Sequence, residues 1–344
     1  MLKIVKQKKE VKSLKIESLL DKLKKLKLIG VHLELIDRKE IRNKKEYSKK
    51  VEAPIRTVSI DKNVKRLIIP DGTDYIEGRR EDSDTDEESL KAFEVEEVVV
   101  LPESLRIIEK ECFANNVIGS IELPSKLEYI GYQAFRECAG FKTIKFPETL
   151  KFIGDGAFAQ TDITGKIVLP SNLKTLGNEA FAICERLEEV DFNRCEIERL
   201  NTGLFEYCTE LESVKNISDN TLYIEDYAFY NCLSLKNIEI PRRLARIGNL
   251  VFYGSGVTDV DMSSDGIQLK ELKNNEFTFC GNLETVRFPE SFESIALSTF
   301  DNCPNLKLID FSKSRSLKGG EELSNLLSVY DMVEIKLPEH IKIH

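Results

Sequence analysis

The hydrophobic positions of this chain follow one phrase that recurs along most of its length. An aliphatic residue is followed five positions later by phenylalanine, first as Ile108 and Phe113 and last as Ile295 and Phe300. Successive phenylalanines of the nine copies lie 22 to 25 residues apart. They are Phe113, Phe135, Phe158, Phe181, Phe205, Phe229, Phe252, Phe277 and Phe300. This period is typical of a solenoid coil rather than of a globular domain.

The aligned copies share the consensus Pro-x-x-Leu-x-x-Ile-Gly-x-x-Ala-Phe-x-x-Cys-x-x-Leu-x-x-Ile-x-Ile/Phe. Its last part alternates apolar and polar residues, as in Ile144-Lys145-Phe146 and Ile238-Glu239-Ile240. The alternation predicts a short strand with one buried face. The next proline lacks an N–H group, so we expect it to end the strand.

Two further slots of the repeat have a physical explanation. The glycine is expected to take a positive φ and to bend the chain before the Ala-Phe pair enters the core. The phenylalanines are expected to stack, because a single coil cannot bury its own apolar face. The copies at residues 200–205 and 272–277 lack the glycine, so we expect distorted coils there. The glycines are Gly131, Gly154, Gly177 and Gly248.

With these residues in view, the chain resembles the BspA-like class of leucine-rich repeats. The hallmark segment is Ile130-Gly131-Tyr132-Gln133-Ala134-Phe135-Arg136-Glu137-Cys138. The resemblance covers roughly residues 64 to 338, from a first strand near Leu67 to a last one near Ile335. It implies an α/β repeat solenoid, a curved stack of about ten 23-residue coils with short parallel strands.

We predict two parts in the chain. Residues 1–56 form a basic helix/strand segment, and residues 57–344 form the solenoid with a disordered acidic insertion at about residues 77–89. Within this insertion, Asp82, Asp84 and Asp86 imitate a calcium loop. Glu87 and Phe93 stand where that loop requires glycine and glutamate, so no calcium site is predicted.

The N-terminal segment is basic, with 17 Lys and Arg against 7 Asp and Glu in residues 1–50, whereas the whole chain has a net charge of −9. Its apolar residues between Val11 and Leu26 form one stripe of a helix, and Val31, Leu33 and Leu35 alternate as in a strand. One interpretation is a cap on the open end of the solenoid. The alternative is a basic helix that meets an anionic lipid surface, nucleic acid or a partner helix.

The cysteines have a structural explanation. Six of the eight lie three residues after the repeat phenylalanine: Cys138, Cys184, Cys208, Cys232, Cys280 and Cys303. We expect a small buried side chain in this slot, because Asn116, Thr161 and Ser255 replace cysteine in other copies. Paired ligands at zinc spacing do not occur, and reduced thiols fit a cytoplasmic chain. No cofactor or metal is predicted.

The outward side chains of the predicted strands form the candidate binding surface. In the repeat register, one row contains Asp191, Lys215, Glu239, Asp261, Arg287 and Asp310, and its neighbour contains Glu189 and Asp259. These eight residues are the predicted partner-binding positions. Carboxylates predominate among them, so we predict an acidic stripe that repels nucleic acid and binds a protein. The alternative is a solvated charged face without a ligand.

Catalysis has no support in the sequence. The three histidines, His32, His340 and His344, all lie in the terminal segments, outside the nine copies of the repeat. Neighbouring carboxylates such as Asp259 and Asp261 lie on an open strand, without the enclosed pocket that acid/base chemistry needs. We therefore predict a protein that is not an enzyme.

These observations predict a non-catalytic scaffold that binds a protein partner on the strand-lined face of the solenoid. A surface adhesin for host or matrix proteins is the alternative that the BspA-like resemblance implies. A membrane-associated regulator that uses the basic N-terminal helix is a third hypothesis. The start of the chain has no signal-peptide pattern and no apolar run is long enough to span a bilayer, so we expect a cytoplasmic protein, with the cell surface as the alternative.

Overall fold

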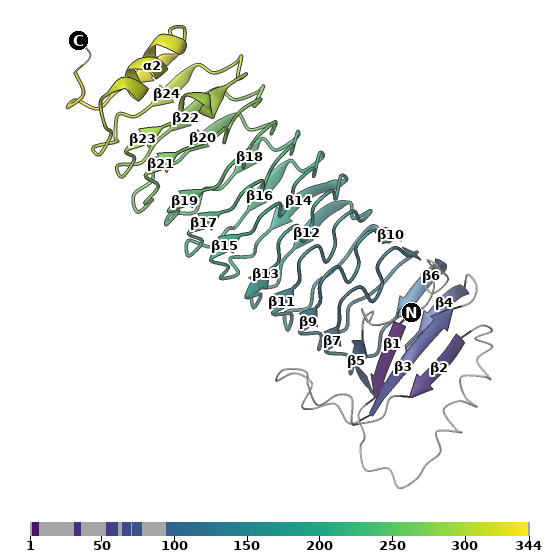
Figure 1. Cartoon of the computed structure of the whole chain (residues 1–344). Helices are drawn as coiled ribbons and strands as arrows, with labels where there is room; N and C mark the ends of the chain where they lie inside the picture. Colours follow the sequence, from purple (N-terminus) through teal and green to yellow (C-terminus); the bar gives the residue numbers. More distant parts are fainter. Residues whose placement is uncertain are drawn as a thin grey trace.

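The computed structural model describes residues 2–6, 31–35, 53–60, 64–69, 71–77 and 94–342. In this part of the chain, coils of about 23 residues stack along one axis into a solenoid of about 11 turns (Figure 1). The repeat solenoid that the sequence predicts is therefore confirmed. Helices are few, because most of each return arm is formed by tight turns.

One side of the stack carries the strands that the alternating pattern predicts. They form three sheets of parallel strands, ordered β10-β8-β6-β4, β12-β14-β16-β18 and β20-β22-β24-β25. Their bounds are β4 Val64–Ile68, β6 Glu94–Val100, β8 Val117–Ile118, β10 Ala139–Gly140, β12 Gly165–Val168, β14 Leu187–Asp191, β16 Ser213–Lys215, β18 Asn237–Ile238, β20 Asp259–Asp261, β22 Thr285–Arg287, β24 Leu308–Asp310 and β25 Glu334–Lys336.

The other side carries short strands that the sequence did not predict. From β7 onward each ends at the aliphatic residue that precedes the glycine slot, and the short strands also pair in parallel with one another. Their bounds are β5 Thr73–Glu77, β7 Ile107–Ile108, β9 Tyr129–Ile130, β11 Phe152–Ile153, β13 Thr175–Leu176, β15 Arg199–Leu200, β17 Tyr223–Ile224, β19 Arg246–Ile247, β21 Glu271–Leu272 and β23 Ser294–Ile295. Each coil therefore has two strand-lined sides.

One predicted strand is not formed. Residues 144–146 have no strand pairing, and their coil instead contributes β10, five residues earlier. Gly140, the last residue of β10, has a positive φ of 100°. The alternation of burial still holds, since Ile144 is buried and Lys145 is exposed. The sequence pattern predicted the buried face here but not the hydrogen bonding.

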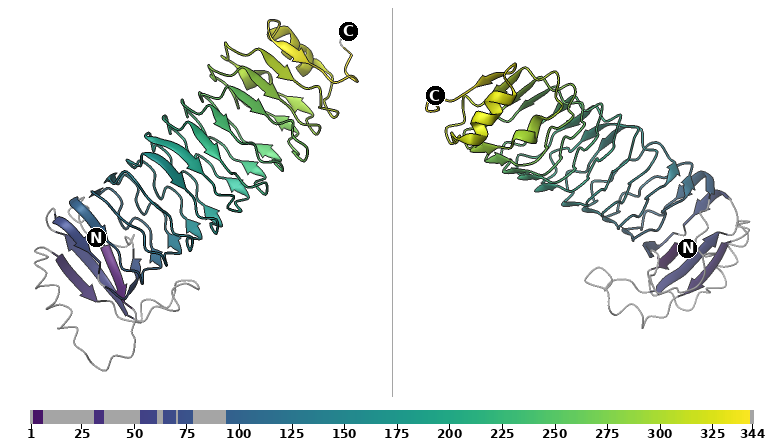
Figure 2. Two further views of the ribbon diagram at one scale, coloured as in Figure 1. Left: turned by 180° about the vertical axis from the view of Figure 1, so that it is seen from behind. Right: turned by 45° about the horizontal axis from the view of Figure 1, so that its top comes forward.

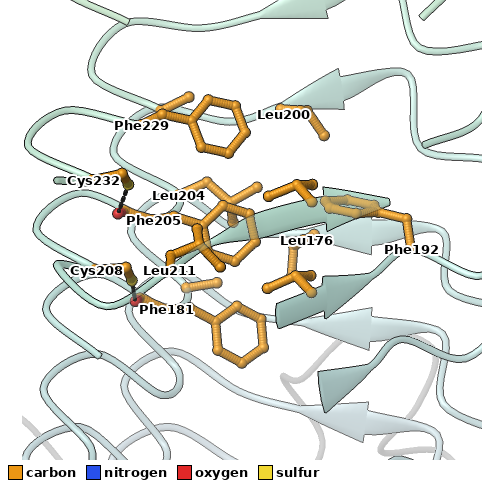
Figure 3. Packing of buried hydrophobic residues seen from close by; sticks show 14 of the residues in the cluster. Leu176, Phe181, Phe192, Leu200, Leu204, Phe205, Cys208, Leu211, Phe229 and Cys232 are labelled. Atoms are coloured by element: carbon orange, nitrogen blue, oxygen red, sulfur yellow. Dashed lines mark hydrogen bonds between the residues drawn. The ribbon is translucent and has the colours of Figure 1, made fainter. Parts of the chain in front are cut away.

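The core is a continuous column of phenylalanine rings, as expected. Adjacent repeat phenylalanines from Phe113 to Phe300 stack with ring centroids 5.1 to 5.9 Å apart. Figure 3 shows Phe181, Phe205 and Phe229 one above the other, beside Leu176 and Leu200. Each coil inside this column thus buries its aromatic ring against both neighbours, which is the nearest-neighbour stabilisation of a solenoid.

The cysteine slot is buried beside this column, which confirms its structural interpretation. The thiol of Cys208 donates to the carbonyl oxygen of Phe181, and that of Cys232 donates to Phe205, each at 3.1 Å (Figure 3). The same contact to the preceding coil recurs at Cys138, Cys184, Cys280 and Cys303. Burial raises the pKa of the Cys138 thiol to about 12, so this thiol stays protonated at neutral pH.

The repeat glycines are needed for a different reason from the expected one. Gly131, Gly154, Gly177 and Gly248 are not among the residues with positive φ. Instead, a Cβ atom at Gly154 would lie 2.6 Å from the carbonyl carbon of Gly131, on the preceding coil. Glycine allows neighbouring coils to approach closely, so the expectation of a left-handed bend is wrong.

The short-strand sheet is interrupted at two coils that lack this glycine, as expected for residues 200–205 and 272–277. The short-strand sheet ends at β13 and begins again at β15, where Asn201 fills the glycine slot. It ends again at β19 and begins at β21, where Lys273 fills the slot. Glu109, Glu225 and Ala296 also replace the glycine, yet β7, β17 and β23 stay paired with the preceding short strand. The missing glycine alone therefore does not explain the two breaks.

Both ends of the solenoid are covered by other elements (Figure 2). At the N-terminal end, β1 (Leu2–Lys6) pairs antiparallel with β5 and with β3 (Ala53–Ile60), and β2 (Val31–Leu35) pairs with β3. At the other end, helix α2 (Glu321–Val329) buries Leu323 and Leu326 and lies against β23 and the 3₁₀ helix η4 (Leu297–Phe300). The strand predicted at residues 31–35 is confirmed.

Two sequence predictions for the N-terminal region lie outside the described residues. They are the helix of the basic segment and the acidic insertion beyond Glu77. Glu77 itself is the last residue of β5. Strand β3 crosses the predicted boundary at residue 56, and the division into two parts stays a prediction.

Candidate protein-binding surface

The eight predicted binding residues share one side of the stack. We call the outward side chains of β12 to β25 on this side the candidate face. Asp191 on β14 lies opposite Lys215 on β16, and Arg287 on β22 lies between Asp261 and Asp310 on the neighbouring strands. The buried residues between them, such as Val190 and Val260, point into the core. The register that the repeat predicts is therefore correct.

The predicted acidic stripe is divided into two groups. Strands β12, β14, β16 and β18 form one sheet, and strands β20, β22, β24 and β25 form the next. Strand β18 pairs only with β16. Glu189, Asp191, Lys215 and Glu239 thus belong to one group, in which Glu239 directly follows β18. Asp259, Asp261, Arg287 and Asp310 belong to the other. A partner would meet two short ladders rather than one unbroken row.

Lysine side chains neutralise the carboxylates of the first group. The ammonium nitrogen of Lys166 lies 2.9 Å from Glu189 and 3.1 Å from Asp191, and that of Lys215 lies 2.6 Å from Glu189. Hydrogen bonds from Lys215 and Lys166 hold the pKa of Glu189 below its usual range. This part of the candidate face is therefore a charge-balanced cluster, and it is less acidic than the carboxylate count alone indicates.

Three of the predicted aspartates also hold the ends of the strands. The carboxylate of Asp191 accepts the N–H of Asn193 at 2.9 Å, that of Asp261 accepts Ser263 at 2.8 Å, and that of Asp310 accepts Ser312 at 2.9 Å. At these positions the chain has no proline, so a backbone donor remains to be satisfied. The sequence signal was present: each aspartate stands two residues before a position where proline would end the strand.

The remaining carboxylates are the most available for a partner. Glu239 and Asp259 are exposed and take part in no ion pair among the side chains that the structure describes. Glu239 accepts the N–H of Asn216 at 2.8 Å, and Asp259 accepts the hydroxyl of Thr285. Each is thus held in place by one hydrogen bond and still has acceptor capacity toward solvent.

Sequence reasoning missed a second polar side of the stack, which we call the second face. It consists of the outward side chains of the short strands. The rings of Tyr129 and Phe152 stack at 4.5 Å, and the guanidinium of Arg199 lies 3.9 Å from the ring centre of Tyr223. The residue before each repeat aliphatic supplies this row, so the same period could have revealed it.

The described residues contain neither a candidate metal site nor a candidate membrane span. Among them, no group of three His, Cys, Asp or Glu side chains is arranged to hold a metal ion. In the same residues, every helix is too short or too polar to cross a bilayer. What the candidate face can do is form ion pairs and hydrogen bonds at fixed strand spacing.

Stacked parallel strands, a phenylalanine core and polar strand faces define a leucine-rich repeat solenoid, a class of scaffold that is typically non-enzymatic and generally binds proteins. The chain belongs to the family of the BspA type leucine rich repeat region. The profile of this family, with 6 copies, matches residues 106–221 and 199–319, more than half of the chain. The resemblance indicated by the repeat consensus is confirmed.

Several solved structures are similar in fold. A leucine-rich repeat protein from Bacteroides ovatus is 25% identical with a TM-score of 0.60, over 91% of this chain and 78% of that one. A leucine rich cell surface protein from Faecalibacterium prausnitzii is 18% identical, with a TM-score of 0.40 over 87% of this chain and 96% of that one. The pneumococcal vaccine antigen PcpA is 15% identical, with a TM-score of 0.41 over 92% and 98%. The comparison with curated proteins gave no match.

Proposed function

We propose that this chain is a non-catalytic scaffold that binds a protein partner on the candidate face. The observation that carries the proposal is the registered array of polar side chains on paired strands, such as Asp259 opposite Thr285 and Asp261 opposite Arg287. The buried residues between them fix their spacing at about 4.8 Å from strand to strand. A partner would meet groups that are already ordered, which lowers the entropic cost of binding.

The proposed contact residues are Glu189, Asp191, Lys215, Glu239, Asp259, Asp261, Arg287 and Asp310. Within this set, Glu239 and Asp259 make the charged contacts, because both are exposed and unneutralised by a neighbouring base. The other aspartates and the Glu189 cluster shape the surface. Six of the eight residues are carboxylates, which repel the phosphate backbone of a nucleic acid. The proposed partner is therefore a protein rather than a nucleic acid.

The proposal is tested by charge reversal on one face at a time. The full chain, its Glu239→Lys/Asp259→Lys variant and a Glu271→Lys control are immobilised and exposed to extract from the source cells. Glu271 is an exposed carboxylate on β21, on the second face. We expect a protein that the parent and the control retain and that the double variant loses by roughly tenfold or more. Retention of the same proteins by all three chains would contradict the proposed face.

A cell-surface adhesin is the second candidate function. Membership of the BspA-type family supports it, because the family resemblance implies surface proteins that engage host or matrix proteins. The same polar strand faces would serve this role. Protease treatment of intact source cells distinguishes the two locations. Cleavage of the chain before lysis supports the adhesin, and protection until lysis supports a scaffold inside the cell.

A further inference from the structure

A third surface of the solenoid carries a cluster of aromatic side chains. It lies on the turn edge, which we define as the turns that lead from each short strand to the next long strand. Tyr207, Tyr227 and Phe279 are 40%, 37% and 50% exposed, and Tyr230 and Tyr253 are half-buried between them. We call these five residues the aromatic patch. Neither strand-lined side contains them.

The rings of the aromatic patch form one connected row across neighbouring coils. Tyr230 and Tyr253 are stacked, with centroids 4.9 Å apart and planes 7° apart. The other contacts are edge-to-face or tilted: Tyr207 with Tyr230 at 5.4 Å, Tyr227 with Tyr230 at 5.7 Å, and Tyr253 with Phe279 at 5.2 Å. The rings therefore hold one another in place, so a partner would lose little side-chain entropy on binding them.

The backbone at three of these residues is in the left-handed region. Tyr207, Tyr227 and Phe279 have φ values of 57°, 60° and 61°. This conformation is uncommon for bulky residues and suits glycine or asparagine. In the same turn position as Tyr207 and Phe279, other coils have Asn115, Asn231, Asn302 or Gly254. Folding therefore does not require an exposed aromatic residue there, which points to a role outside the fold.

Two carboxylates border the patch. A Cβ atom at Gly203 would lie 3.0 Å from Cγ of Glu179 and 3.1 Å from Oε2 of Glu206, so both side chains converge over this glycine. Burial and the negative charge of Glu179 raise the pKa of Glu206. No ion pair neutralises either carboxylate among the side chains that the structure describes. A positive charge brought to this point would relieve the repulsion.

We propose that the aromatic patch docks a segment of a partner protein in which apolar side chains are flanked by lysine or arginine. Tyrosine-rich surfaces provide rigid apolar area with hydroxyl groups at its rim, which suits protein recognition. The unneutralised Glu179 and Glu206 select a basic flank. Docking of two copies through the same patch is disfavoured, because it would bring these carboxylates together. The inference rests on the proposed scaffold function and adds a surface separate from the candidate face.

The test uses a phage-displayed library of random linear peptides selected on the full chain. Selected peptides are measured against Tyr207→Asn/Phe279→Asn, Glu206→Gln and a Tyr132→Ser control. Asparagine already occupies this turn position in other coils, so the double variant is expected to fold. Tyr132 is 46% exposed on an earlier coil outside the patch, so its loss controls for any exposed tyrosine.

We expect peptides that combine aliphatic residues with Lys or Arg and that bind more weakly as salt increases. Their affinity should fall by about tenfold or more in the double variant, fall less in Glu206→Gln, and stay unchanged in Tyr132→Ser. Selection of acidic peptides, or peptide affinities that are unchanged in the double variant, would overturn the proposal. A dimer of the chain that the double variant abolishes would also overturn it. Either result leaves the charge-reversal test of the candidate face unaffected.

Discussion

At the scale of single residues, carboxylates hold the turns of this solenoid together. Asp191 accepts the N–H of Asn193, the side-chain amide of Asn216 at 2.9 Å and the ammonium of Lys166. Burial opposes its ionisation, but these three contacts outweigh burial and lower its pKa. The residue is thus part of the predicted binding face and also a cap on the end of β14.

Replacing Asp191 by alanine should destabilise the protein by about 1 kcal/mol, because the N–H of Asn193 loses its partner. Asp191→Asn, which keeps one acceptor oxygen, should lose less. The pKa of Asp191 is lower in the folded state than in the unfolded state. Its contribution to stability is therefore complete above the unfolded pKa of about 3.9 and disappears as pH falls through the folded pKa. Urea unfolding at several pH values measures this. An alanine effect that is equally large in strong acid would contradict the assigned contact.

The pKa of Glu276 is shifted in the opposite direction from that of Asp191. It occupies the alanine slot before Phe277 and is 1% exposed, and its Oε1 accepts the N–H groups of Lys273 and Asn274 at 2.7 and 2.9 Å. Its other oxygen, Oε2, has no hydrogen-bond partner. Burial raises the pKa of this carboxyl despite the backbone hydrogen bonds. Ionisation of this carboxyl therefore weakens the folded state.

We expect Glu276→Gln to be more stable than the parent at neutral pH, by about 1 kcal/mol or more, because the amide keeps the acceptor and removes the buried charge. Because the folded pKa is raised, the parent should lose stability as pH rises through it, whereas the glutamine variant should not. Glu276→Ala is the control that removes the acceptor as well. Unfolding curves at acidic and neutral pH that show the same stability difference would contradict this explanation.

At the scale of elements, the repeat glycine allows close backbone contact between coils at Gly131, Gly154, Gly177 and Gly248. The sequence revealed the coils, the buried phenylalanines and the register of the candidate face, because each follows from a strict period. It did not reveal the short strands or why the glycine is needed, because both depend on backbone contacts between coils. The pattern also predicted a strand at residues 144–146, which have no strand pairing in the structure.

Gly154→Ala should destabilise the protein by roughly 1–3 kcal/mol, because its Cβ would lie 2.6 Å from the backbone of the preceding coil. Gly165→Ala is the matched control. Gly165 has a φ of 69°, but its Cβ would meet nothing within 4 Å, so only backbone strain is added. Thermal unfolding of both variants compares the two costs. An equal or larger loss at Gly165 would mean that conformation, and not coil spacing, explains the repeat glycine.

At the scale of the whole molecule, the solenoid presents three chemically different surfaces on one rigid stack. The candidate face offers polar ladders, the second face offers stacked rings and arginine, and the turn edge offers the aromatic patch. The sequence could predict the candidate face, because its residues recur at the repeat period. It could not predict that lysines neutralise Glu189 or that aromatic residues from different coils meet on the turn edge. Those features arise when coils stack.

The most direct test of the scaffold function is site-specific photo-crosslinking in the source cells. A photoreactive residue is placed at Asn237 on the candidate face or at Thr175 on the second face, both exposed strand positions. A protein partner on the candidate face predicts a discrete protein adduct from position 237 and none from position 175. No protein adduct from position 237, or the same adduct from both positions, would contradict the proposed function and its surface.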